Sequence, residues 1–504
     1  MDEIILGTYF VSLLILFMFG CHGFVMVYHY LRHKDDTDEQ AQPLTEYPMV
    51  TVQLPIYNEM YVVRRLIEAS CSMDYPKENL EIQVLDDSTD ETVEIVERIV
   101  AEMRARGNNI DHVRRGSRSG FKAGALKEGL RNASGNFIAI FDADFVPRKE
   151  FLLKTLPFFY ADEKVGMVQT RWEHLNAEYS LLTRTQAMAL DGHFVIEQAI
   201  RNKAGFFINF NGTGGIWRKA CILDAGDWQS DTLTEDLDLS YRAQLRGWRF
   251  KFLKNVTSPA ELPSEINALK SQQFRWTKGA IETARKVLPK VWKSGLPFRM
   301  KLHSTFHLTN NIVFPFILVA GVLNIPLMFI KHAGGYESYF ELMSMFVFAF
   351  IGSFLFYMYS QKDVYSDWRR RLFLFPLFMA GSMGFAVNNS KAVIEGLFKR
   401  KSEFVRTPKY SINGKKDSWL DKKYVPVKFS WVAIIEMVLA VYCFFGVVSS
   451  LYYLEIAAVP FQLLFCMGFS FVSYLSIQQA LQARKVRLAQ LSARVQMQSE
   501  PIAA

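Results

Sequence analysis

The chain has 504 residues, of which 50% are hydrophobic, and a formal net charge of +8 at pH 7. This length exceeds one ordinary domain core, and the apolar residues gather in separate stretches, so we expect both a water-soluble region and a membrane region. The basic residues lie beside the apolar stretches, where anionic lipid and positive-inside topology explain them, and no RNA-binding motif accompanies them, which excludes nucleic acid as a partner.

The first apolar stretch, residues 5–29, has no charged residue apart from two histidines, and a hydrocarbon core needs roughly 20 residues to be crossed. A cleaved signal peptide is the alternative. It requires a basic segment before a shorter apolar core, whereas this chain begins Met-Asp-Glu and its basic residues follow the apolar run. We therefore expect an uncleaved anchor.

Short apolar runs then alternate with amphipathic stretches between residues 48 and 262. The expected strands are residues 49–56, 81–85, 136–141 and 165–170, and the expected helices are about 60–72, 90–106, 120–132 and 149–159. This βαβ series predicts an α/β fold with a mostly parallel sheet, which binds ligands at the carboxyl ends of its strands.

Beyond residue 305 the chain is strongly apolar again, in the runs 306–330, 341–359, 372–389, 430–452 and 457–477. Counted with the first stretch, these give six possible spans. If residues 372–389 crossed, the Lys- and Arg-rich segments on either side would face opposite compartments, whereas both should stay cytosolic. We therefore expect a re-entrant or interfacial helix there, five spans, an external N-terminus and a cytosolic C-terminal tail.

Acidic residues collect where the expected strands end. Asp86 and Asp87 follow the second strand, and Asp142 and Asp144 follow the third in the sequence Phe-Asp-Ala-Asp-Phe. Two carboxylates two residues apart can offer hard oxygen ligands to Mg²⁺ or Mn²⁺, which take their remaining ligands from water and phosphate. Each motif alone also fits a turn or a helix cap. For the nearby Asp90, this structural role and a role in the site are equal alternatives.

The motifs that follow give the pattern its specificity: Phe-Asn-Gly-Thr-Gly-Gly at 210–215, Thr-Glu-Asp at 234–236 and Gln-Gln-Phe-Arg-Trp at 272–276. In this order, over roughly residues 48–410, the chain resembles the processive family 2 glycosyltransferases of the cellulose synthase and hyaluronan synthase type. The glycine-rich run and the single N-terminal span look more like those of the cellulose synthase-like mannan and glucan synthases than like those of cellulose synthase itself. The resemblance implies a GT-A-type, Rossmann-like catalytic domain beside an α-helical transmembrane region.

The same resemblance assigns roles to the residues at the motif positions. Asp86 and Asp87 would hold the nucleoside, Lys122 would approach the diphosphate, and Asp142 and Asp144 would serve the diphosphate and its divalent metal, Mg²⁺ or Mn²⁺. These five residues form the expected site for a nucleotide-sugar donor.

Asp236 becomes the general base of an inverting transfer. A single displacement at the anomeric carbon needs a base for the proton of the acceptor hydroxyl and a cation for the departing nucleotide diphosphate. Glu235 beside it is assigned to acceptor binding. The structural alternative is that Thr234 only caps the helix that begins here.

Three residues of the Gln-x-x-Arg-Trp motif lie within one helical turn and can project to one side. Arg275 can grip the diphosphate with its planar fork, while Gln272 and Trp276 are assigned to the acceptor sugar. The alternative is an amphipathic interfacial helix with its tryptophan at headgroup level.

The segment Phe404-Val-Arg-Thr-Pro-Lys409 resembles the gating loop F-x-V-T-x-K of polymer synthases. The resemblance implies that Thr407 and Lys409 contact the phosphates of the bound nucleotide. The match departs from the pattern at Arg406, which replaces valine, and at Pro408, which stiffens the loop. An ordinary basic juxtamembrane loop is the alternative.

Polar residues inside the apolar runs are costly and usually face protein or water. Asn310, Asn311 and Glu436 are of this kind. They are candidate channel residues, and interhelical hydrogen bonding is an equal alternative.

Together these features predict an integral multi-pass membrane enzyme with a cytosolic catalytic domain. It would move a hexose from UDP-glucose or GDP-mannose onto a growing β-glycan and translocate the product, with donor, glycan acceptor and bilayer as partners. The alternatives are a single transfer to a lipid acceptor, as in ceramide glucosyltransferases, and a non-enzymatic membrane scaffold or transporter subunit. The expected parts are an N-terminal helix (1–30), a linker (31–47), the catalytic domain (48–262), interfacial helices (263–305), two spans (306–360), an interfacial helix with the gating-like loop (361–428), two spans (429–478) and a cytosolic tail (479–504).

Overall fold

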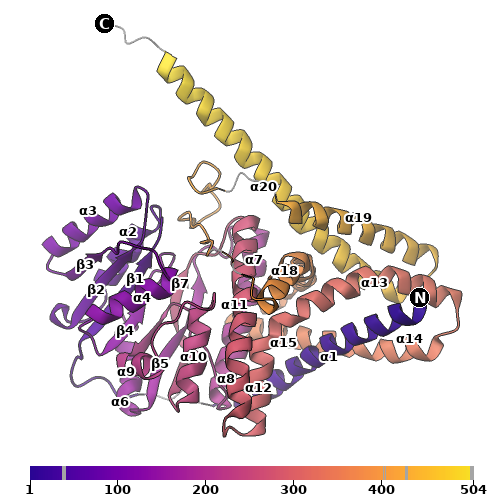
Figure 1. Cartoon of the computed structure of the whole chain (residues 1–504), viewed down its shortest axis with the longest axis horizontal. Coiled ribbons are helices and arrows are strands. Elements are labelled where there is room, and N and C mark those ends of the chain that lie inside the picture. The colour runs from indigo at the N-terminus through magenta and orange to yellow at the C-terminus, as the bar shows by residue number, and fades with distance from the viewer. Residues whose placement is uncertain (37–40, 401, 403, 426–429, 500–504) are drawn as a thin grey trace.

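The computed structural model describes residues 1–36, 41–400, 402, 404–425 and 430–499. Within them the chain forms an α/β domain and, beside it, a bundle of long apolar helices (Figure 1). Helix α1 (Asp2–His33) belongs to the bundle, so the chain passes from the bundle into the α/β domain and back.

A single seven-stranded sheet forms the centre of the α/β domain, with the strand order β3-β2-β1-β4-β6-β5-β7. Neighbouring strands run parallel except at β6, which is antiparallel to both β4 and β5. The strands are β1 (Val50–Ile56), β2 (Leu80–Asp86), β3 (Asn109–Val113), β4 (Phe137–Ile140), β5 (Val165–His174), β6 (Gly215–Arg218) and β7 (Arg249–Ala260). The predicted mostly parallel α/β sheet is confirmed.

Helices cover both faces of this sheet, because its central strands are apolar on both sides. In β4, Phe137 and Ala139 enter the core on one face, and Ile138 and Ile140 enter the core on the other. The first face is covered by α2 (Val63–Cys71), α3 (Thr92–Ala105), α5 (Phe151–Thr155) and α6 (Pro157–Ala161). The second face is covered by α4 (Phe121–Asn132), α9 (Lys219–Asp224) and α10 (Glu235–Leu245).

Strands β3, β6 and β7 are absent from the sequence-based expectation. Strands β3 and β7 lie at the two edges of the sheet and carry polar residues among their apolar ones, while β6 has only four residues after a glycine-rich run. Short, polar-interrupted runs lack the continuous apolar signal of a central strand.

The connecting and bundle helices are α7 (Leu181–Asp191), the π-helix η2 (Gly192–Gln198), α8 (Ala199–Lys203), α11 (Ile266–Lys293), α12 (Phe298–Thr309), α13 (Val313–Ala333), α14 (Glu337–Ser344), α15 (Phe348–Val364), α16 (Trp368–Arg371), α17 (Phe375–Gly384), α18 (Ala386–Leu397), α19 (Trp431–Tyr452) and α20 (Val459–Ser499). Short 3-10 turns are η1 (Lys77–Asn79), η3 (Asn310–Ile312), η4 (Met345–Val347), η5 (Leu372–Leu374) and η6 (Ile456–Ala458).

Five helical segments of the described chain are long and apolar enough to cross a membrane: Asp2–His33, Phe298–Ala333, Glu337–Val364, Trp431–Tyr452 and Ile456–Ala489. A sixth apolar stretch, Trp368–Gly384 with Ala386–Leu397, is bent by 45° at its centre. The bend is compatible with a broken span or a re-entrant helix, so the predicted topology and the sides on which the loops lie stay predictions.

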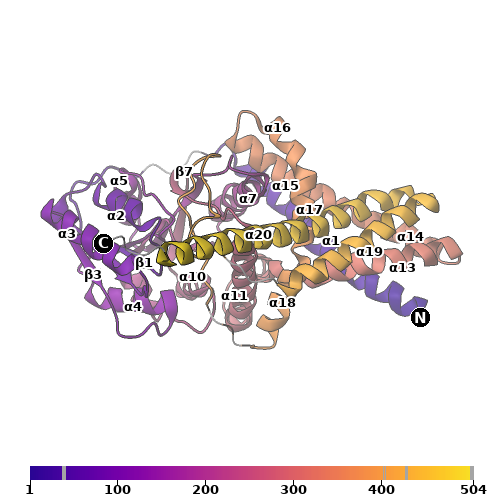
Figure 2. The same ribbon diagram turned by 90° about the horizontal axis from the view of Figure 1, so that it is seen from above.

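Helix α11 stands between the domain and the bundle, and α20 projects out of the bundle with its far end clear of the domain (Figures 1 and 2). At the start of α11 the backbone N–H of Ile266 donates to Gln479 of α20 at 2.8 Å. One turn later Lys270 pairs with Glu436 of α19 at 2.5 Å. The helix that carries the Gln-x-x-Arg-Trp motif is therefore attached to two apolar helices.

Candidate active site

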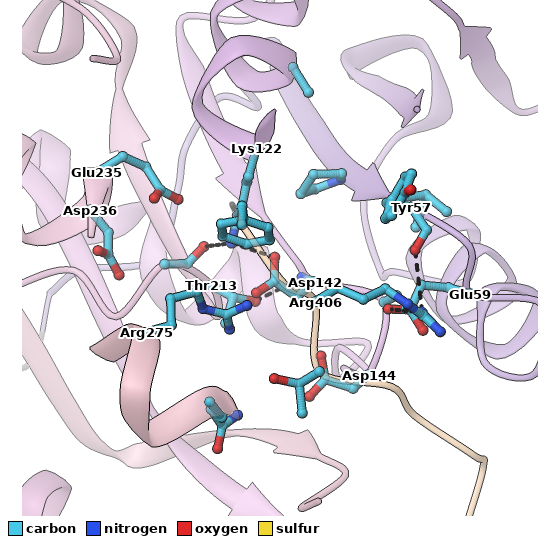
Figure 3. Close-up of a pocket in the computed structure, with 18 of the residues that line it drawn as sticks. Tyr57, Glu59, Lys122, Asp142, Asp144, Thr213, Glu235, Asp236, Arg275 and Arg406 are labelled. Carbon is cyan, nitrogen blue, oxygen red and sulfur yellow. Dashed lines mark hydrogen bonds and ion pairs between the residues drawn. The ribbon is translucent and has the colours of Figure 1, made fainter. Parts of the chain in front are cut away.

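A cavity of ≈ 180 Å³ opens at the carboxyl ends of β1, β2 and β4, where loops from the sheet meet α4, α10, α11 and the segment 404–409 (Figure 3). Eleven of the twelve residues that the sequence assigns to the site line it. They are Asp87, Lys122, Asp142, Asp144, Glu235, Asp236, Gln272, Arg275, Trp276, Thr407 and Lys409. Residues separated by more than 300 positions in the chain thus share one cavity.

Asp86, the twelfth, does not line the cavity. It is 1% exposed, and its carboxylate accepts hydrogen bonds from the backbone of Ser88 at 2.8 Å and from His112 Nε2 at 2.9 Å. Burial opposes ionisation, but these hydrogen bonds prevail and hold the pKa of Asp86 below its usual value. The neighbouring Asp87 does face the cavity, and Arg115 Nε donates to it at 2.7 Å.

Lys122 lies at the centre of the site (Figure 3). Its ammonium lies 2.5 Å from Asp142 Oδ1 and donates to the carbonyl of Gly212 at 2.9 Å. Burial alone would lower the pKa of Lys122, but the carboxylates of Asp142, Glu235 and Asp236 raise it above its usual value. The lysine is therefore a fixed positive charge at the place expected for a diphosphate.

The two carboxylates of the Asp-x-Asp motif each face an ammonium group. Lys409 lies 2.7 Å from Asp144 Oδ2, as Lys122 lies against Asp142. Nowhere in the described ranges do three His, Cys, Asp or Glu residues gather into a metal-binding group. The pair nevertheless fits Mg²⁺ or Mn²⁺, because it offers hard oxygen ligands at positions where the protein itself places cations, and these metals take further ligands from phosphate and water.

Asp236 lies in the first turn of helix α10, beside Glu235 (Figure 3). Burial and the negative charge of Glu235 raise the pKa of Asp236 from 3.8 to about 7. A carboxylate with a pKa near neutrality can both accept and release a proton. Gly212 leaves room for the carboxylate of Asp236: the glycine has a φ of +80°, and a Cβ there would lie 2.9 Å from Asp236 Oδ2.

Thr234 is the N-cap residue of α10 by position, but its side chain makes no capping hydrogen bond. Instead its hydroxyl lies 3.1 Å from that of Thr283 on α11, which fixes the start of α10 against that helix. The capping alternative for Thr-Glu-Asp is therefore wrong.

Helix α11 brings its motif to the cavity from the other side. Its first turn is capped by Glu265, which accepts from the backbone of Asn267 and Ala268. Arg275 donates to the carbonyl of Val405 at 3.2 Å and lies 4.6 Å from the ring centre of Phe404. The guanidinium thus connects α11 to the segment 404–409.

That segment closes one side of the cavity. Phe404 stacks on Phe121 with ring centroids 5.6 Å apart, and the guanidinium of Arg406 lies 2.8 Å from Glu59 Oε1. Thr407 is 7% exposed, and its hydroxyl has no hydrogen-bond partner among the described residues. A buried hydroxyl without a partner is suited to a ligand oxygen.

The cavity residues without an assigned role from the sequence include Tyr57, Glu59 and Arg118. The guanidinium of Arg118 lies 3.4 Å from the ring centre of Tyr57, which leaves a flat cationic and aromatic surface at the rim. Burial raises the pKa of Glu59 to about 8. Tyr57 and Glu59 come just after β1, and this position at the end of a strand could have identified them as site residues from the sequence. No motif or strand end in the sequence around Arg118 identifies that residue.

The polar residues of the apolar runs have different surroundings. Glu436 is fully buried against Lys270, which supports the interhelical alternative for this residue. Asn310 lines a second, mostly apolar cavity of ≈ 680 Å³ among the bundle helices. Asn311 donates to Asn310 and accepts from Thr277, the residue after Trp276.

Comparison with known proteins agrees with this geometry. Residues 48–279 match the family described as "Glycosyltransferase like family 2". The chain is 42% identical over 294 residues to "Probable glucomannan 4-beta-mannosyltransferase 4" of Oryza sativa subsp. japonica, which covers 56% of this chain and 54% of that protein. It is 43% identical over 245 residues to "Glucomannan 4-beta-mannosyltransferase 9" of Arabidopsis thaliana, covering 48% of this chain and 46% of that protein.

The chain spans about half the length of these relatives. Among solved structures, a mannosyltransferase from Pyrobaculum calidifontis in complex with GDP-Man and Mn²⁺ superposes with a TM-score of 0.54 at 20% identity, over 77% of this chain and all of that one. This likeness shows the fold, and the expected GT-A-type catalytic fold is confirmed.

Proposed function

We propose that this chain, whose residues 48–279 match the family described as "Glycosyltransferase like family 2", is a membrane-embedded, inverting and metal-dependent hexosyltransferase that extends a β-glycan. The observation that carries the proposal is the single cavity in which a carboxylate with a pKa of about 7, Asp236, lies across Gly212 from the Lys122–Asp142 pair. A proton acceptor and a diphosphate site are then close enough for one displacement.

In the proposed reaction the hydroxyl oxygen of the acceptor attacks the anomeric carbon of the donor sugar while Asp236 takes the hydroxyl proton. The bond between that carbon and the phosphate oxygen breaks, and the departing nucleotide diphosphate keeps the electron pair. Lys122 and Arg275 neutralise its growing charge, as fixed cations in a largely water-excluded site do effectively. A divalent metal on Asp142 and Asp144 would supply further charge neutralisation.

The remaining residues position the substrates. Asp87 and the Arg118–Tyr57 surface are suited to the nucleoside, with hydrogen bonding from one side and stacking from the other. Gln272 and Trp276 offer an amide and an aromatic face to the acceptor sugar. Thr407 and Lys409 would add contacts to the phosphates from the side of the cavity that the segment 404–409 closes.

We propose GDP-mannose as the donor to test first. The relatives bear the name glucomannan 4-beta-mannosyltransferase, and the solved structure with the same fold contains GDP-Man and Mn²⁺. UDP-glucose is the comparison donor, because pocket specificity depends on a few hydrogen bonds that a shared fold does not fix.

We further propose that the product leaves through the second cavity and that the catalytic domain is cytosolic. This cavity extends from Glu197 and Arg201, beside the α/β domain, to Lys331 in the last turn of α13 and Glu455 just before η6. It contains several aromatic rings on which sugars can stack, and Asn310 at its wall is one residue from the contact that Asn311 makes next to Trp276.

The test is turnover by the purified protein in nanodiscs. Radiolabelled GDP-mannose and UDP-glucose are supplied separately, with Mn²⁺, with Mg²⁺ or with chelator, and the product is sized with and without digestion by β-mannanase. A metal-dependent polymer that the enzyme degrades supports the proposal. A product one sugar long and attached to lipid refutes the polymerase assignment, and absence of transfer from either donor refutes the activity.

A further inference from the structure

Behind the cavity lies a chain of polar side chains that the reaction scheme does not use. The π-helix η2 carries His193 and Glu197, and His193 Nδ1 lies 3.0 Å from Glu197 Oε2. On its other side His193 Nε2 lies 2.8 Å from Nδ2 of Asn211. Asn211 lines the cavity, whereas the histidine and the glutamate are not among the residues that line it.

The chemistry of these groups fixes which atom holds each proton. The amide nitrogen of Asn211 can only donate, so Nε2 of His193 accepts and the ring proton stays on Nδ1, where it is donated to Glu197. Burial opposes ionisation of Glu197, but the hydrogen bond from His193 and the charge of Arg201, 3.3 Å away, hold its pKa well below the usual value. An ionised glutamate therefore holds the ring in one tautomer and one orientation.

Asn211 is fixed by two further contacts, one to its side-chain oxygen and one from its backbone N–H. Gln198 Nε2 donates to Asn211 Oδ1 at 2.5 Å, and the backbone N–H of Asn211 donates to Gln169 Oε1 at 3.0 Å. An amide has two N–H donors and two acceptor lone pairs, so one donor and one lone pair of Asn211 stay available. That combination matches a sugar hydroxyl, which both donates and accepts.

Asn211 is adjacent in the chain to Gly212, whose missing Cβ leaves room for Asp236. A hydroxyl held by Asn211 therefore lies in the region where the proton is transferred. Misplacing such a group by about 1 Å can lower the rate by about a hundredfold.

On the premise of the proposed transfer reaction, we propose that Asn211 binds one sugar hydroxyl in this cavity and that His193, held by Glu197, is the positioning residue that orients the Asn211 amide. The hydroxyl belongs either to the donor hexose or to the terminal sugar of the acceptor. The same polar recognition serves both, and analogues that each lack one hydroxyl distinguish them.

The test combines variants with analogues in nanodiscs: GDP-mannose lacking single hydroxyls, and mannotetraose lacking single hydroxyls on its nonreducing sugar. We expect Asn211→Ala to lower kcat/KM about tenfold with the complete substrates, the effect of one lost hydrogen bond. With the one analogue that lacks the bound hydroxyl, wild type and Asn211→Ala should differ by less than about twofold. A donor analogue showing this behaviour assigns the hydroxyl to the donor, and an acceptor analogue assigns it to the acceptor.

His193→Ala should show the same analogue pattern, and adding it to Asn211→Ala should lower kcat/KM by no more than about twofold, because both changes remove one interaction. His193→Gln, whose side chain can present an acceptor oxygen near the Nε2 position, should recover most of the activity. His174→Ala is the matched control: His174 also pairs with a carboxylate, Asp191 at 3.2 Å, and is not among the residues that line the cavity. It should show no analogue dependence.

Equal losses of Asn211→Ala with every analogue would refute a hydroxyl contact, and additive losses in the double variant would refute positioning by His193. If His193→Ala does not fold, the comparison between His193→Gln and wild type across the analogues decides the positioning role. Absence of turnover by the wild type with both GDP-mannose and UDP-glucose would be a failure of the proposed reaction, which the wild-type measurement reveals before any variant is compared.

Discussion

Replacing Asp236 by asparagine should separate stability from activity in the catalytic domain. The pKa of Asp236 rises from 3.8 to about 7 in the folded protein because burial and Glu235 oppose its ionisation. When a carboxyl has a higher pKa folded than unfolded, the unfolded chain loses its proton first, so stability declines as pH rises from about 4 to about 7. This rise in pKa corresponds to about 4 kcal/mol of stability at most, and all of that stability is lost above pH 7.

Asparagine is neutral throughout this range and avoids that loss. At pH 8 we expect the variant to be more stable than the wild type by about 2–4 kcal/mol, a rise of about 5–10 °C in the thermal midpoint for a domain of this size. At pH 5 the wild type has lost only about 1–2 kcal/mol of this stability, so the difference between the two proteins should be correspondingly smaller than at pH 8. Turnover should fall by at least about a hundredfold, because the amide cannot take the proton of the acceptor hydroxyl.

The assay is thermal unfolding of the ligand-free protein in detergent from pH 5 to pH 8, with donor binding and turnover measured on the same samples. Asp238→Asn is the matched control, since Asp238 lies on the same helix but is fully buried between Arg242 at 2.9 Å and Lys286 at 3.0 Å. Removing that partner should destabilise the protein at every pH by about 3 kcal/mol. An Asp236→Asn protein that melts below the wild type at pH 8, or that keeps its turnover, would refute the reasoning.

Three further variants test other parts of the site. Asp144→Ala should weaken nucleotide binding and remove its dependence on Mn²⁺, which calorimetry with and without Mn²⁺ measures; an unchanged effect of Mn²⁺ would contradict the assignment. Arg406→Ala should raise the donor KM about tenfold, since the segment 404–409 loses its attachment to the buried Glu59, whereas Lys423→Ala, which breaks an exposed ion pair, should leave KM unchanged. Lys270→Met should lower the stability by about 3–5 kcal/mol, because Glu436 stays buried without its partner, and adding Glu436→Met should restore most of it; equal melting of the single and double variants would contradict this.

The sequence predicts the centre of the fold better than its edges. Strands β1, β2, β4 and β5 are apolar runs of sufficient length, so periodicity finds them. Strand β6 follows Phe-Asn-Gly-Thr-Gly and runs antiparallel, and its place between β4 and β5 depends on long-range pairing that no local pattern contains.

The site divides in the same way. Residues that follow a strand or belong to a spaced motif, such as Asp142 and Asp236, could be placed in the cavity from the sequence. Asp86 could not be distinguished from Asp87, because only the tertiary contact with His112 shows which of two adjacent carboxylates turns inward. His193 was missed for a similar reason, since its partner Asn211 lies 18 positions away and only the fold brings the two together.

The two lysines on the Asp-x-Asp carboxylates have a consequence for the order in which ligands arrive. In the ligand-free protein Lys122 and Lys409 act as built-in counterions, so the acidic pair is already neutralised. A free divalent ion must displace both ammonium groups and leave them close to its own charge. A nucleotide that arrives as its metal complex instead brings phosphate oxygens to which both lysines can turn. Titration with Mn²⁺ alone should therefore show much weaker binding than titration in the presence of nucleotide.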